Sequence, residues 1–422
     1  MSLRIAYAGM THLGLCSAVA AAERGAEVIG YDPDPERVQA LSAGRLPVNE
    51  PDLPELLAAN GGRIRFSSDP SALADRDLIY VAPDVPTDAE GTSDLGPVEQ
   101  LLAHVDACAR PETPVVLLSQ VPPGFTRRHP RRQGPLFYQV ETLIFGRAME
   151  RALHPERTIV GCADPAAGLP ESYGTFLASF DAPVLPMRYE SAELAKISIN
   201  VCLAASLSAA NTLAEVCEEL GAVWSEIVPA LRLDRRIGAH AYIEAGLGIA
   251  GGNIERDLTT TVQLAHALGT DGGVVEAFIA NSQHRRDWAL RTLHAQLPPQ
   301  RAARIAVLGL AYKPDTASTK NSPALALIDA LHPFELHVYD PVVTLDPETR
   351  PRVRTARSAL DACQRADAVA IMTAWPEFRE LKPLELARDM QGRSVVDPFG
   401  VLDVEACREA GLEHLRLGSP AL

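Results

Sequence analysis

The sequence has no excess of basic residues, and this deficit limits its partners. It carries 39 Lys and Arg against 54 Asp and Glu, which gives a formal net charge of −15 at pH 7. A broad surface for nucleic acid or another polyanion is therefore unfavourable, although a small basic pocket for one phosphate-bearing ligand is compatible with this balance. We expect no nucleic-acid partner.

Long apolar runs and a signal sequence are also missing. No uninterrupted apolar run reaches the roughly 18 residues that suggest a membrane span. The start, Met1-Ser2-Leu3-Arg4, leads directly into a strand-like segment without the profile of a signal peptide. We expect a soluble, cytoplasmic protein with no membrane partner.

The cysteines form no close pair of the kind that clamps zinc. Most lie in apolar or helical stretches, where a buried free thiol behaves as a small hydrophobe. The sequence therefore predicts no metal site and no cysteine nucleophile. The seven are Cys16, Cys108, Cys162, Cys202, Cys217, Cys363 and Cys407.

What the chain does have is enough length and apolar content for more than one domain. At 422 residues, 47% of them hydrophobic, it exceeds what one core usually organises. Short apolar runs at residues 3–8, 27–31, 78–82 and 115–118 alternate with helical patterns, which favours a parallel sheet covered on both faces. A second series at residues 304–308, 336–339, 369–372 and 394–396 repeats this logic.

A continuous helical pattern separates the two series. Residues 191–220 contain no Gly or Pro, and a helix of about 30 residues would be roughly 45 Å long. Such a helix can link domains and form the core of a dimer. We expect an α/β fold with two Rossmann-like, doubly wound domains (residues 1–187 and 301–422), joined by this long helix and a helical middle domain (188–300), and assembled as a homodimer.

The first strand is followed by a glycine-containing turn, Gly9-Met10-Thr11-His12-Leu13-Gly14. It resembles G-x-G-x-x-G with the middle glycine replaced. In such turns the first glycine permits the bend, the middle one lets the backbone approach pyrophosphate, and the third lets helix and strand pack closely. Thr11 adds a side chain where the phosphates should pass, so a purely structural turn remains an alternative to a cofactor site.

Asp32 strengthens the cofactor hypothesis because it ends the second strand. A carboxylate there can accept hydrogen bonds from an adenosine ribose, and it would repel a 2′-phosphate, so NAD is favoured over NADP. The alternative is a solvated turn acid within Asp32-Pro33-Asp34-Pro35. Arg37 is either a phosphate contact or an ordinary surface residue.

Matching motifs in all three regions resemble the UDP-glucose/GDP-mannose dehydrogenase family. One example is Leu308-Gly309-Leu310-Ala311-Tyr312-Lys313-Pro314. The matches lie at residues 9–14, 32–37, 49–51, 91–94, 119–124 and 154–157, then at 192–200, 234–238 and 246–257, and finally at 308–316, 322–323 and 339–341. The resemblance thus covers nearly the whole chain.

Members of that family oxidise the primary alcohol of a nucleotide sugar twice with NAD, through an aldehyde held on a cysteine and a thioester that water hydrolyses. The family places the cysteine in a run like Gly-Gly-Ser-Cys, and here the matching run begins Gly251-Gly252-Asn253. By resemblance, Asn253 stands at the cysteine position. An amide cannot form a thiohemiacetal, which closes the thioester route. Asn253 could hydrogen-bond a hydroxyl or carbonyl, or cap the following helix.

Other positions depart from the family pattern as well. Glu141 matches the first glutamate of a catalytic segment, but Phe145 replaces the second. Gln120 takes the place of a threonine near the reacting centre, and Lys320 stands where an arginine is usual, giving a point charge in place of a bidentate fork. In the last domain Phe399 replaces an arginine that contacts the nucleotide. A cluster of arginines at residues 127–132 is interpreted as a solvated loop, with a new anion site as the alternative.

The resemblance implies three sets of site residues. Lys196, Asn200 and Asp257 match groups that position the sugar hydroxyl and a water, and a lysine near a carboxylate can hold a water or act as a base. With Glu141 and Asn253 they form the candidate catalytic set. The candidate substrate contacts are Arg236, Gly248, Tyr312 and Lys313, and the candidate cofactor contacts are Gly9, Thr11, Gly14, Asp32, Arg37, Pro86, Ser119, Gln120 and Lys320.

Two functional hypotheses follow from this pattern. The first is an NAD-dependent oxidoreductase that acts on a nucleotide sugar or related glycosyl compound and is limited to a two-electron or transient, epimerase-like oxidation. The second is a non-catalytic binding or scaffold protein that kept the fold, because the departures at the site suit decay as well as repurposing.

Overall fold

The first unit of the chain, Met1–Ile199, is built on an eight-stranded sheet. Its strands are β1 (Arg4–Ala8), β2 (Glu27–Tyr31), β3 (Ile64–Ser67), β4 (Leu78–Val81), β5 (Val115–Leu117), β6 (Leu136–Gln139), β7 (Thr158–Cys162) and β8 (Val184–Arg188). They lie in the order β3-β2-β1-β4-β5-β6-β7-β8, and of these neighbouring strands, within the described residues, only β6 and β7 run antiparallel. The computed structural model describes residues 2–88, 93–129, 134–297, 303–331, 334–346 and 348–420.

The strand order places a switch point beside β1. Chain order reverses there, because β2 and β3 lie on one side of β1 and β4 to β6 on the other. Ala8 is opposite Tyr31 in β2 and opposite Val81 in β4, so these three parallel strands end at one edge. Open α/β sheets bind their ligands outside such an edge. The residues that follow these strands are therefore brought together by topology.

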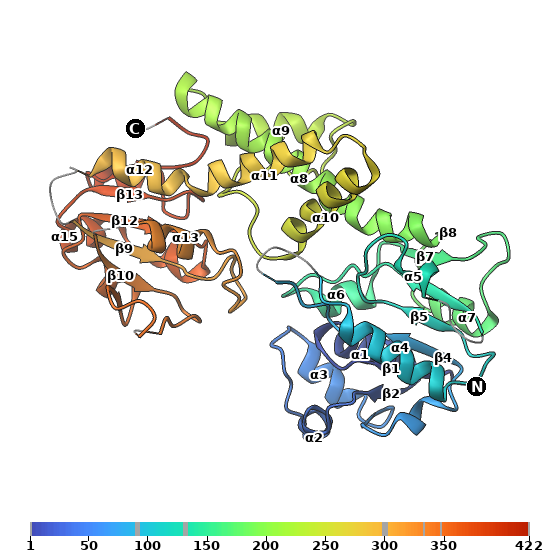
Figure 1. Cartoon of the computed structure of the whole chain (residues 1–422). Helices are drawn as coiled ribbons and strands as arrows, with labels where there is room; N and C mark the ends of the chain where they lie inside the picture. Colours follow the sequence, from blue (N-terminus) through green and yellow to red (C-terminus); the bar gives the residue numbers. More distant parts are fainter. Residues whose placement is uncertain are drawn as a thin grey trace. The chain divides into compact units, whose positions relative to one another are not determined.

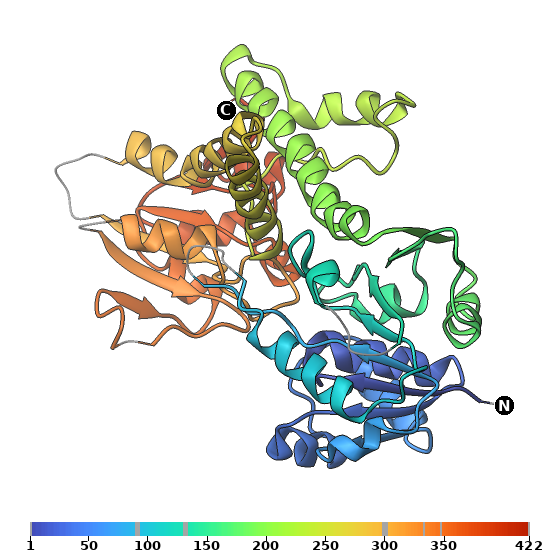
Figure 2. The ribbon, with the colours of Figure 1, turned by 45° about the vertical axis from the view of Figure 1, so that its right-hand side comes forward.

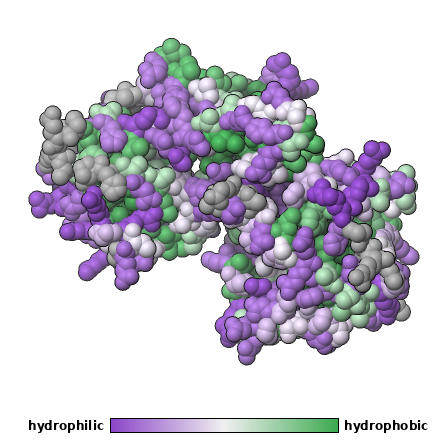
Figure 3. Space-filling model, viewed as in Figure 1, coloured by the Kyte–Doolittle hydropathy of each residue, from purple (hydrophilic) through white to green (hydrophobic). Residues whose placement is uncertain are grey.

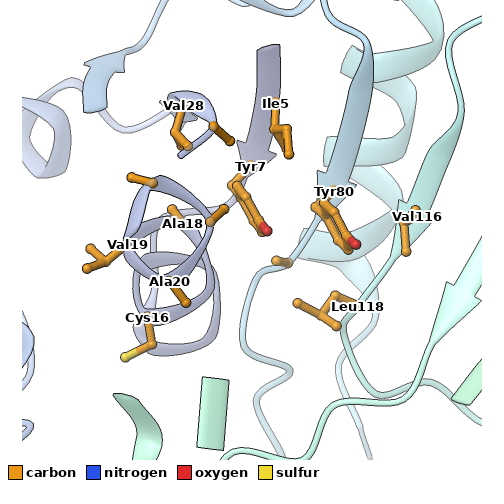
Figure 4. Close-up of a cluster of buried hydrophobic side chains, with 14 of the residues drawn as sticks. Ile5, Tyr7, Cys16, Ala18, Val19, Ala20, Val28, Tyr80, Val116 and Leu118 are labelled. Carbon is orange, nitrogen blue, oxygen red and sulfur yellow. The ribbon is translucent and has the colours of Figure 1, made fainter. Parts of the chain in front are cut away.

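Helices cover both faces of this sheet (Figure 1). They are α1 (His12–Glu23), α2 (Pro35–Ser42), α3 (Leu53–Ala59), η1 (Pro70–Leu73), α4 (Gly96–Cys108), α5 (Phe125–Arg128), α6 (Ala148–Leu153) and α7 (Glu171–Ala178). Helix α1 packs on the face that carries Tyr7 and Tyr80, whose rings stack at 4.8 Å (Figure 4). Buried alanines of α1, such as Ala18 and Ala20, let the helix approach the strands closely. Helix α4 packs on the opposite face.

The long helix α8 (Tyr189–Leu220) is unbroken over 32 residues, as the sequence predicted (Figures 1 and 2). The boundary between the two units falls within it, at Ile199 and Asn200. By length and composition alone α8 could cross a membrane, although polar residues interrupt its apolar sequence. The core helix of a soluble protein can have the same length and apolar composition.

The second unit, Asn200–Leu422, begins with the rest of α8 and then α9 (Trp224–Leu233), α10 (Asn253–Leu268), α11 (Gly273–Arg286) and α12 (Trp288–Gln296). Its helices are joined through Glu218 of α8. That carboxylate accepts hydrogen bonds from Arg285 (2.8 Å), the indole of Trp288 (3.0 Å) and the backbone N–H of Gly418 (2.8 Å). Arg285 is fully buried, and its ion pair with Glu218 compensates the cost of removing its charge from water.

A second doubly wound sheet completes this unit. Its strands, β9 (Arg304–Leu308), β10 (Glu335–Tyr339), β11 (Val353–Thr355), β12 (Ala368–Ile371), β13 (Ser394–Val396) and β14 (Glu413–Leu415), lie in the order β11-β10-β9-β12-β13-β14 and pair in parallel. The helices around it are α13 (Pro323–Ala330), α14 (Ala359–Cys363), η2 (Pro376–Glu380), α15 (Pro383–Asp389) and α16 (Val404–Glu409). The predicted fold class is confirmed, whereas the predicted bounds of the three domains stay a prediction.

The surface combines hydrophilic and apolar residues. On the face drawn in Figure 3, hydrophilic residues cover most of the surface and apolar ones are scattered among them. The exposed large hydrophobic residues of α8 are Leu194, Leu213, Val216 and Leu220. The last three are spaced by three and four residues, so they share one stripe of the helix.

Candidate functional site

The turn after β1 depends on two glycines. Gly9 has a φ of +98°, and a Cβ there would lie 2.7 Å from the backbone nitrogen of Pro83. A Cβ on Gly14 would lie 1.8 Å from the carbonyl oxygen of Gly9. The first glycine thus permits the bend and the last lets α1 press against the strand, as the motif requires. Thr11 caps α1 by position, without a side-chain bond to the helix.

Asp32 is buried, with 1% of its surface exposed, so the alternative of a solvated turn acid is wrong. Its carboxylate accepts hydrogen bonds from the backbone N–H groups of Met10 (2.7 Å) and Asp34 (3.0 Å). The guanidinium of Arg37 contacts both carboxylate oxygens, at 2.9 and 3.1 Å. Arg37 is therefore not a plain surface residue, because its guanidinium covers the carboxylate that a ribose would use. A phosphate contact by Arg37 stays a prediction.

We call the turn at residues 9–14, with Asp32 and the start of α1, the half-site of the first unit. Its fit to a dinucleotide is good at the Asp32 end and incomplete at the start of α1. Arg37, whose side chain is 37% exposed, can move aside and leave the buried carboxylate of Asp32 to ribose hydroxyls. At the other end, the start of α1 is where a pyrophosphate should rest. There the N–H of His12 already donates to the carboxylate of Asp84, at 2.9 Å.

The remaining predicted cofactor residues of this unit are placed less favourably. Ser119 is fully buried, and its hydroxyl donates to the carbonyl of Pro83. Pro86 is exposed and its carbonyl accepts the N–H of Asp94 at 2.9 Å, while Gln120 is half-buried. A hydroxyl that is satisfied inside the protein is not presented to a ligand, so the placement of Ser119 supports a structural role.

Lys196 and Glu141 are brought together, although they are far apart in sequence. The ammonium of Lys196, on α8, lies 3.3 Å from the carboxylate of Glu141, in the segment after β6. Both are mostly buried, with side chains 12% and 16% exposed. The backbone N–H of Leu143 also donates to Glu141. A cavity of about 70 Å³ is lined by Glu141 and by Gln139, among others.

A buried histidine at the start of α1 was missed in the sequence. The ring nitrogen Nε2 of His12 lies 2.9 Å from the carboxylate of Glu50, which also accepts the N–H groups of Gly146 and Ala148. The ring of His12 stacks on that of Phe145 at 4.3 Å and 8°. These contacts attach the segment that carries Glu141 to the turn at residues 9–14. The partners of His12 lie so far away in the sequence that no motif spacing reveals them.

In the second unit Asn200 and Asp257 form a buried pair between α8 and α10. The amide of Asn200 donates to Asp257 at 2.5 Å, and Asp257 is fully buried. Arg256 also reaches the carboxylate, at 3.3 Å. Asn253 is the exposed first residue of α10, four positions before Asp257 and therefore on the same side of the helix. The N-cap position of α10 is Gly252, so the alternative that Asn253 is the cap residue is wrong.

The turn before Asn253 is bordered by two of the predicted ligand contacts. A Cβ on Gly251 would lie 3.1 Å from the ring of Tyr312, and one on Gly252 would lie 3.1 Å from the side chain of Lys320. The N–H of Gly251 donates to the carbonyl of Lys320 at 3.2 Å. The ammonium of Lys313 lies 5.8 Å from the centre of the Tyr312 ring. Lys320, predicted as a cofactor contact, is thus adjacent to the Asn253 turn.

Gly248 and Arg236 are not gathered into that cluster. Gly248 has a φ of +74°, and a Cβ there would lie 2.3 Å from the carbonyl of Ser282, so the glycine serves packing. Arg236 has an 89% exposed side chain and pairs with Asp234 at 2.7 Å. Of the arginine cluster, residues 130–133 lie outside the described residues, and Arg127 pairs with Glu190.

Three buried thiols are poorly activated for nucleophilic attack, and an exposed one is poorly placed for it. Burial, assisted by nearby carboxylates, raises the pKa of Cys363 to about 12 and that of Cys407 to about 11. Burial also raises the pKa of Cys16 far above its usual value. Cys202 is exposed on α8, but it lies about 200° around the helix from Asn200, at about 100° per residue.

Sequence models of one family match most of the chain. The NAD binding domain of the UDP-glucose/GDP-mannose dehydrogenase family matches residues 3–175, its central domain residues 190–283, and its UDP binding domain residues 306–404. The UDP-glucose 6-dehydrogenase TuaD of Bacillus subtilis is 30% identical over 438 residues, covering 99% of this chain and 94% of that protein.

Other similar proteins include a second curated relative and a solved structure. The UDP-glucose 6-dehydrogenase of Rhizobium meliloti is 29% identical over 443 residues, covering 99% of this chain and 100% of that protein. The structure of a UDP-glucose dehydrogenase from the hyperthermophilic archaeon Pyrobaculum islandicum has a TM-score of 0.85 at 28% identity, covering 100% of this chain and 98% of that one.

Proposed function

Because the chain belongs to the UDP-glucose/GDP-mannose dehydrogenase family, we propose that it is an NAD-dependent oxidoreductase that performs only the hydride-transfer half of the family's chemistry. The substrate is a nucleotide sugar or a related glycosyl compound in the cytoplasm. The reaction is either a single two-electron oxidation of a carbinol or an oxidation followed by re-reduction, which would invert a stereocentre.

The observation that carries this proposal is the amide at the start of α10. From the resemblance of the Gly251-Gly252-Asn253 run to the family's motif, we infer that Asn253 stands at the position of the nucleophilic cysteine. It is exposed and lies on the same side of α10 as Asp257, so its carboxamide can reach a ligand held by that helix. A carboxamide can donate to or accept from a sugar oxygen, but it cannot capture a carbonyl carbon as a thiolate does.

Two pairs of buried polar residues support the proposed hydride transfer. Lys196 and Glu141, 3.3 Å apart, provide a mostly buried acid–base pair that can take the hydroxyl proton as the carbinol carbon loses its hydride. Asn200 and Asp257 hold each other at 2.5 Å and can orient the sugar oxygen or a water. When bound, NAD supplies the hydride acceptor.

In this proposal the nucleotide end of the substrate binds at the cluster around Tyr312. Lys313 offers a positive charge for a phosphate, and the ring of Tyr312 offers a flat apolar surface beside the Gly251 turn. Lysine binds phosphate as a point charge without the geometry of an arginine fork, so specificity must come from the shape of the pocket.

The decisive experiment follows NADH and product together. The purified chain is incubated with NAD and a panel of nucleotide sugars, absorbance is read at 340 nm, and the product is examined by NMR. We expect at most one NADH per sugar with an aldehyde or ketone product, or an epimer without net NADH. Lys196→Met should abolish the reaction, whereas Lys382→Met, at the residue before α15, should leave it unchanged. Formation of a sugar acid would contradict the proposal.

A non-catalytic scaffold is the second candidate, and one observation favours it. Both ends of the half-site on the first unit are satisfied within the chain, by Arg37 on Asp32 and by Asp84 on the start of α1. Calorimetry with NAD separates the two functions, because a scaffold with a decayed site would bind no NAD at millimolar concentration.

We further propose that the protein is a homodimer that uses the apolar stripe of α8. Leu213, Val216 and Leu220 are 49%, 46% and 76% exposed, and a partner helix would remove them from water. Light scattering after size-exclusion chromatography should give twice the chain mass, and Val216→Glu should yield the monomer. The matched control is Val274→Glu, at a 62% exposed valine of α11, which should leave the dimer intact. A single chain mass for the unmodified protein would contradict the proposal.

A further inference from the structure

A carboxylate occupies the start of the cofactor helix. Helix α1 begins at His12, and its N–H donates to the carboxylate of Asp84 at 2.9 Å. In return, the backbone N–H of Asp84 donates to the hydroxyl of Thr11 at 2.7 Å. These two hydrogen bonds attach the segment after β4 to the turn after β1.

This is the position that dinucleotide-binding folds reserve for phosphate. The first N–H groups of a helix have no partner within the helix, and the helix dipole makes its start favourable for an anion. In a doubly wound sheet the pyrophosphate rests on the helix after the first strand, at the switch point. Asp84 follows β4, the neighbour of β1 on the other side of that switch point, so its carboxylate arrives where a phosphate oxygen would.

Thr11 has a defined part in this arrangement. It stands at the middle position of the turn, where a glycine would leave the backbone open to pyrophosphate. Its hydroxyl instead holds the backbone of Asp84, and so keeps the acidic side chain beside the helix. The departure of Thr11 from the glycine pattern and the placement of Asp84 are therefore two parts of one feature.

We propose that Asp84 is an internal competitor for the cofactor's pyrophosphate, and that the Thr11–Asp84 contact sets the affinity for NAD. The inference rests on the proposed function, because it assumes that the first unit binds a dinucleotide. Asp84 is exposed, so its side chain can leave when the cofactor enters. Its negative charge then remains close to two phosphates, which weakens their binding further.

The test measures binding of three ligands by calorimetry, without any sugar present. NAD and ADP-ribose both carry the pyrophosphate, whereas adenosine reaches only the Asp32 end. Asp84→Asn keeps the size of the side chain and removes its charge, so NAD and ADP-ribose should bind about three- to tenfold more tightly, and adenosine should be unaffected.

Two further variants keep the result interpretable. Thr11→Gly should shift the affinities in the same direction, and the double variant should gain less than the sum of the two, because both changes act on one contact. The matched control is Asp403→Asn. Asp403 caps α16 in the second unit through the N–H of Ala406 at 2.8 Å, so it loses the same charge at a helix start without touching the cofactor turn.

Unchanged or weaker binding of NAD by Asp84→Asn would overturn the proposal, as would an equal gain for adenosine. The outcome is separable from that of the proposed function. If Asp84→Asn tightens NAD binding but no variant oxidises or epimerises a sugar, the competitor stands and the oxidoreductase fails. If the unmodified chain turns over sugars and Asp84→Asn binds NAD no better, the oxidoreductase stands and the competitor fails. If no variant binds NAD, both fail.

Discussion

The two sheets carry the same turn beside their switch points, and they use it differently. Gly9 and Gly309 both have positive φ, +98° and +89°, and both donate their N–H to the last residue of the neighbouring strand at 2.8 Å, to Tyr31 and Tyr339. In each case the next residue along that neighbouring strand is a buried aspartate, Asp32 or Asp340.

The difference lies in what satisfies the two carboxylates. Asp340 accepts five hydrogen bonds, from the N–H groups of Leu310, Ala311, Val342 and Val343 and from the indole of Trp375. Asp32 accepts two backbone N–H groups and the partly exposed guanidinium of Arg37. Asp340 is thus fixed by groups that cannot leave, whereas Asp32 can exchange one partner for a ligand.

The helix that follows the turn differs as well. Helix α1 begins at His12, directly after the first turn, and so presents its N-terminus to the switch point. In the second unit a loop intervenes, and α13 begins only at Pro323. The same strand-turn geometry is therefore followed by a helix N-terminus in one unit and by a loop in the other, so a buried aspartate after the second strand does not by itself bring a helix N-terminus to the turn.

The largest expected effect comes from adding a methyl group at the second turn. In Gly309→Ala the new Cβ would lie 2.5 Å from that of Thr373, at a φ that side chains rarely adopt. Clash and backbone strain together should lower the free energy of unfolding by about 3 kcal/mol or more, measured by urea denaturation. Gly411→Ala is the control, since its φ is +68° with nothing within 4 Å, and it should cost only about 1–2 kcal/mol. Equal losses would show that packing at the turn is irrelevant.

Exchanging the two aspartates for asparagine should give opposite results. Asp340→Asn turns an amide toward N–H donors and should lower the free energy of unfolding by about 2–3 kcal/mol, with NAD affinity unchanged. Asp32→Asn should cost less stability, because Arg37 can turn to water, but it should weaken NAD binding about tenfold. Denaturation and calorimetry on both variants provide the check. A loss of NAD affinity in Asp340→Asn would remove the distinction between the turns.

Acid should affect the second turn in a defined direction. Burial acts to raise the pKa of Asp340, but its backbone hydrogen bonds outweigh burial, and the pKa falls below the usual 3.8. When folding lowers the pKa of a carboxylate, its ionised form stabilises the folded protein. This contribution is complete above the pKa of the unfolded chain, and it is lost as the pH falls through the pKa of the folded protein. The free energy of unfolding should therefore decline below about pH 4, and Asp340→Asn should flatten part of that decline. A parallel curve for the variant would contradict this origin.

The fold could be predicted because its signals are local. Alternating apolar runs, the glycine at each turn and the absence of Gly and Pro in residues 191–220 specify strands, bends and the long helix within short windows. The partners of the site could not be predicted in this way. Asp84 reaches His12 across 72 positions and Glu141 reaches Lys196 from another element, and only the parallel order of the strands brings such residues to one edge.

The resemblance suggested site residues but not their partners. It predicted Ser119 and Arg236 as ligand contacts. The hydroxyl of Ser119 instead donates to the carbonyl of Pro83, and the guanidinium of Arg236 donates to Asp234 in its own loop. It also marked Phe145 only as a lost glutamate, because nothing in a linear motif shows that an aromatic ring at this position would meet the ring of His12.

The smallest expected effect concerns the stacked rings of His12 and Phe145. Within the described residues, the turn at Gly309 has no such ring pair. The ring of Phe145 is 46% exposed and stacks on buried His12, so Phe145→Leu should lower the free energy of unfolding by only about 1 kcal/mol. Phe399→Leu is the matched control, because Phe399 is 41% exposed and stacks on no ring in the described part of the chain. If both variants lose the same stability in urea, the stacking contributes nothing beyond ordinary burial. If Phe145→Leu alone also weakens NAD binding, the ring pair holds the start of α1 in place for the cofactor, and the first turn is then supported from both sides, by Asp84 and by Phe145.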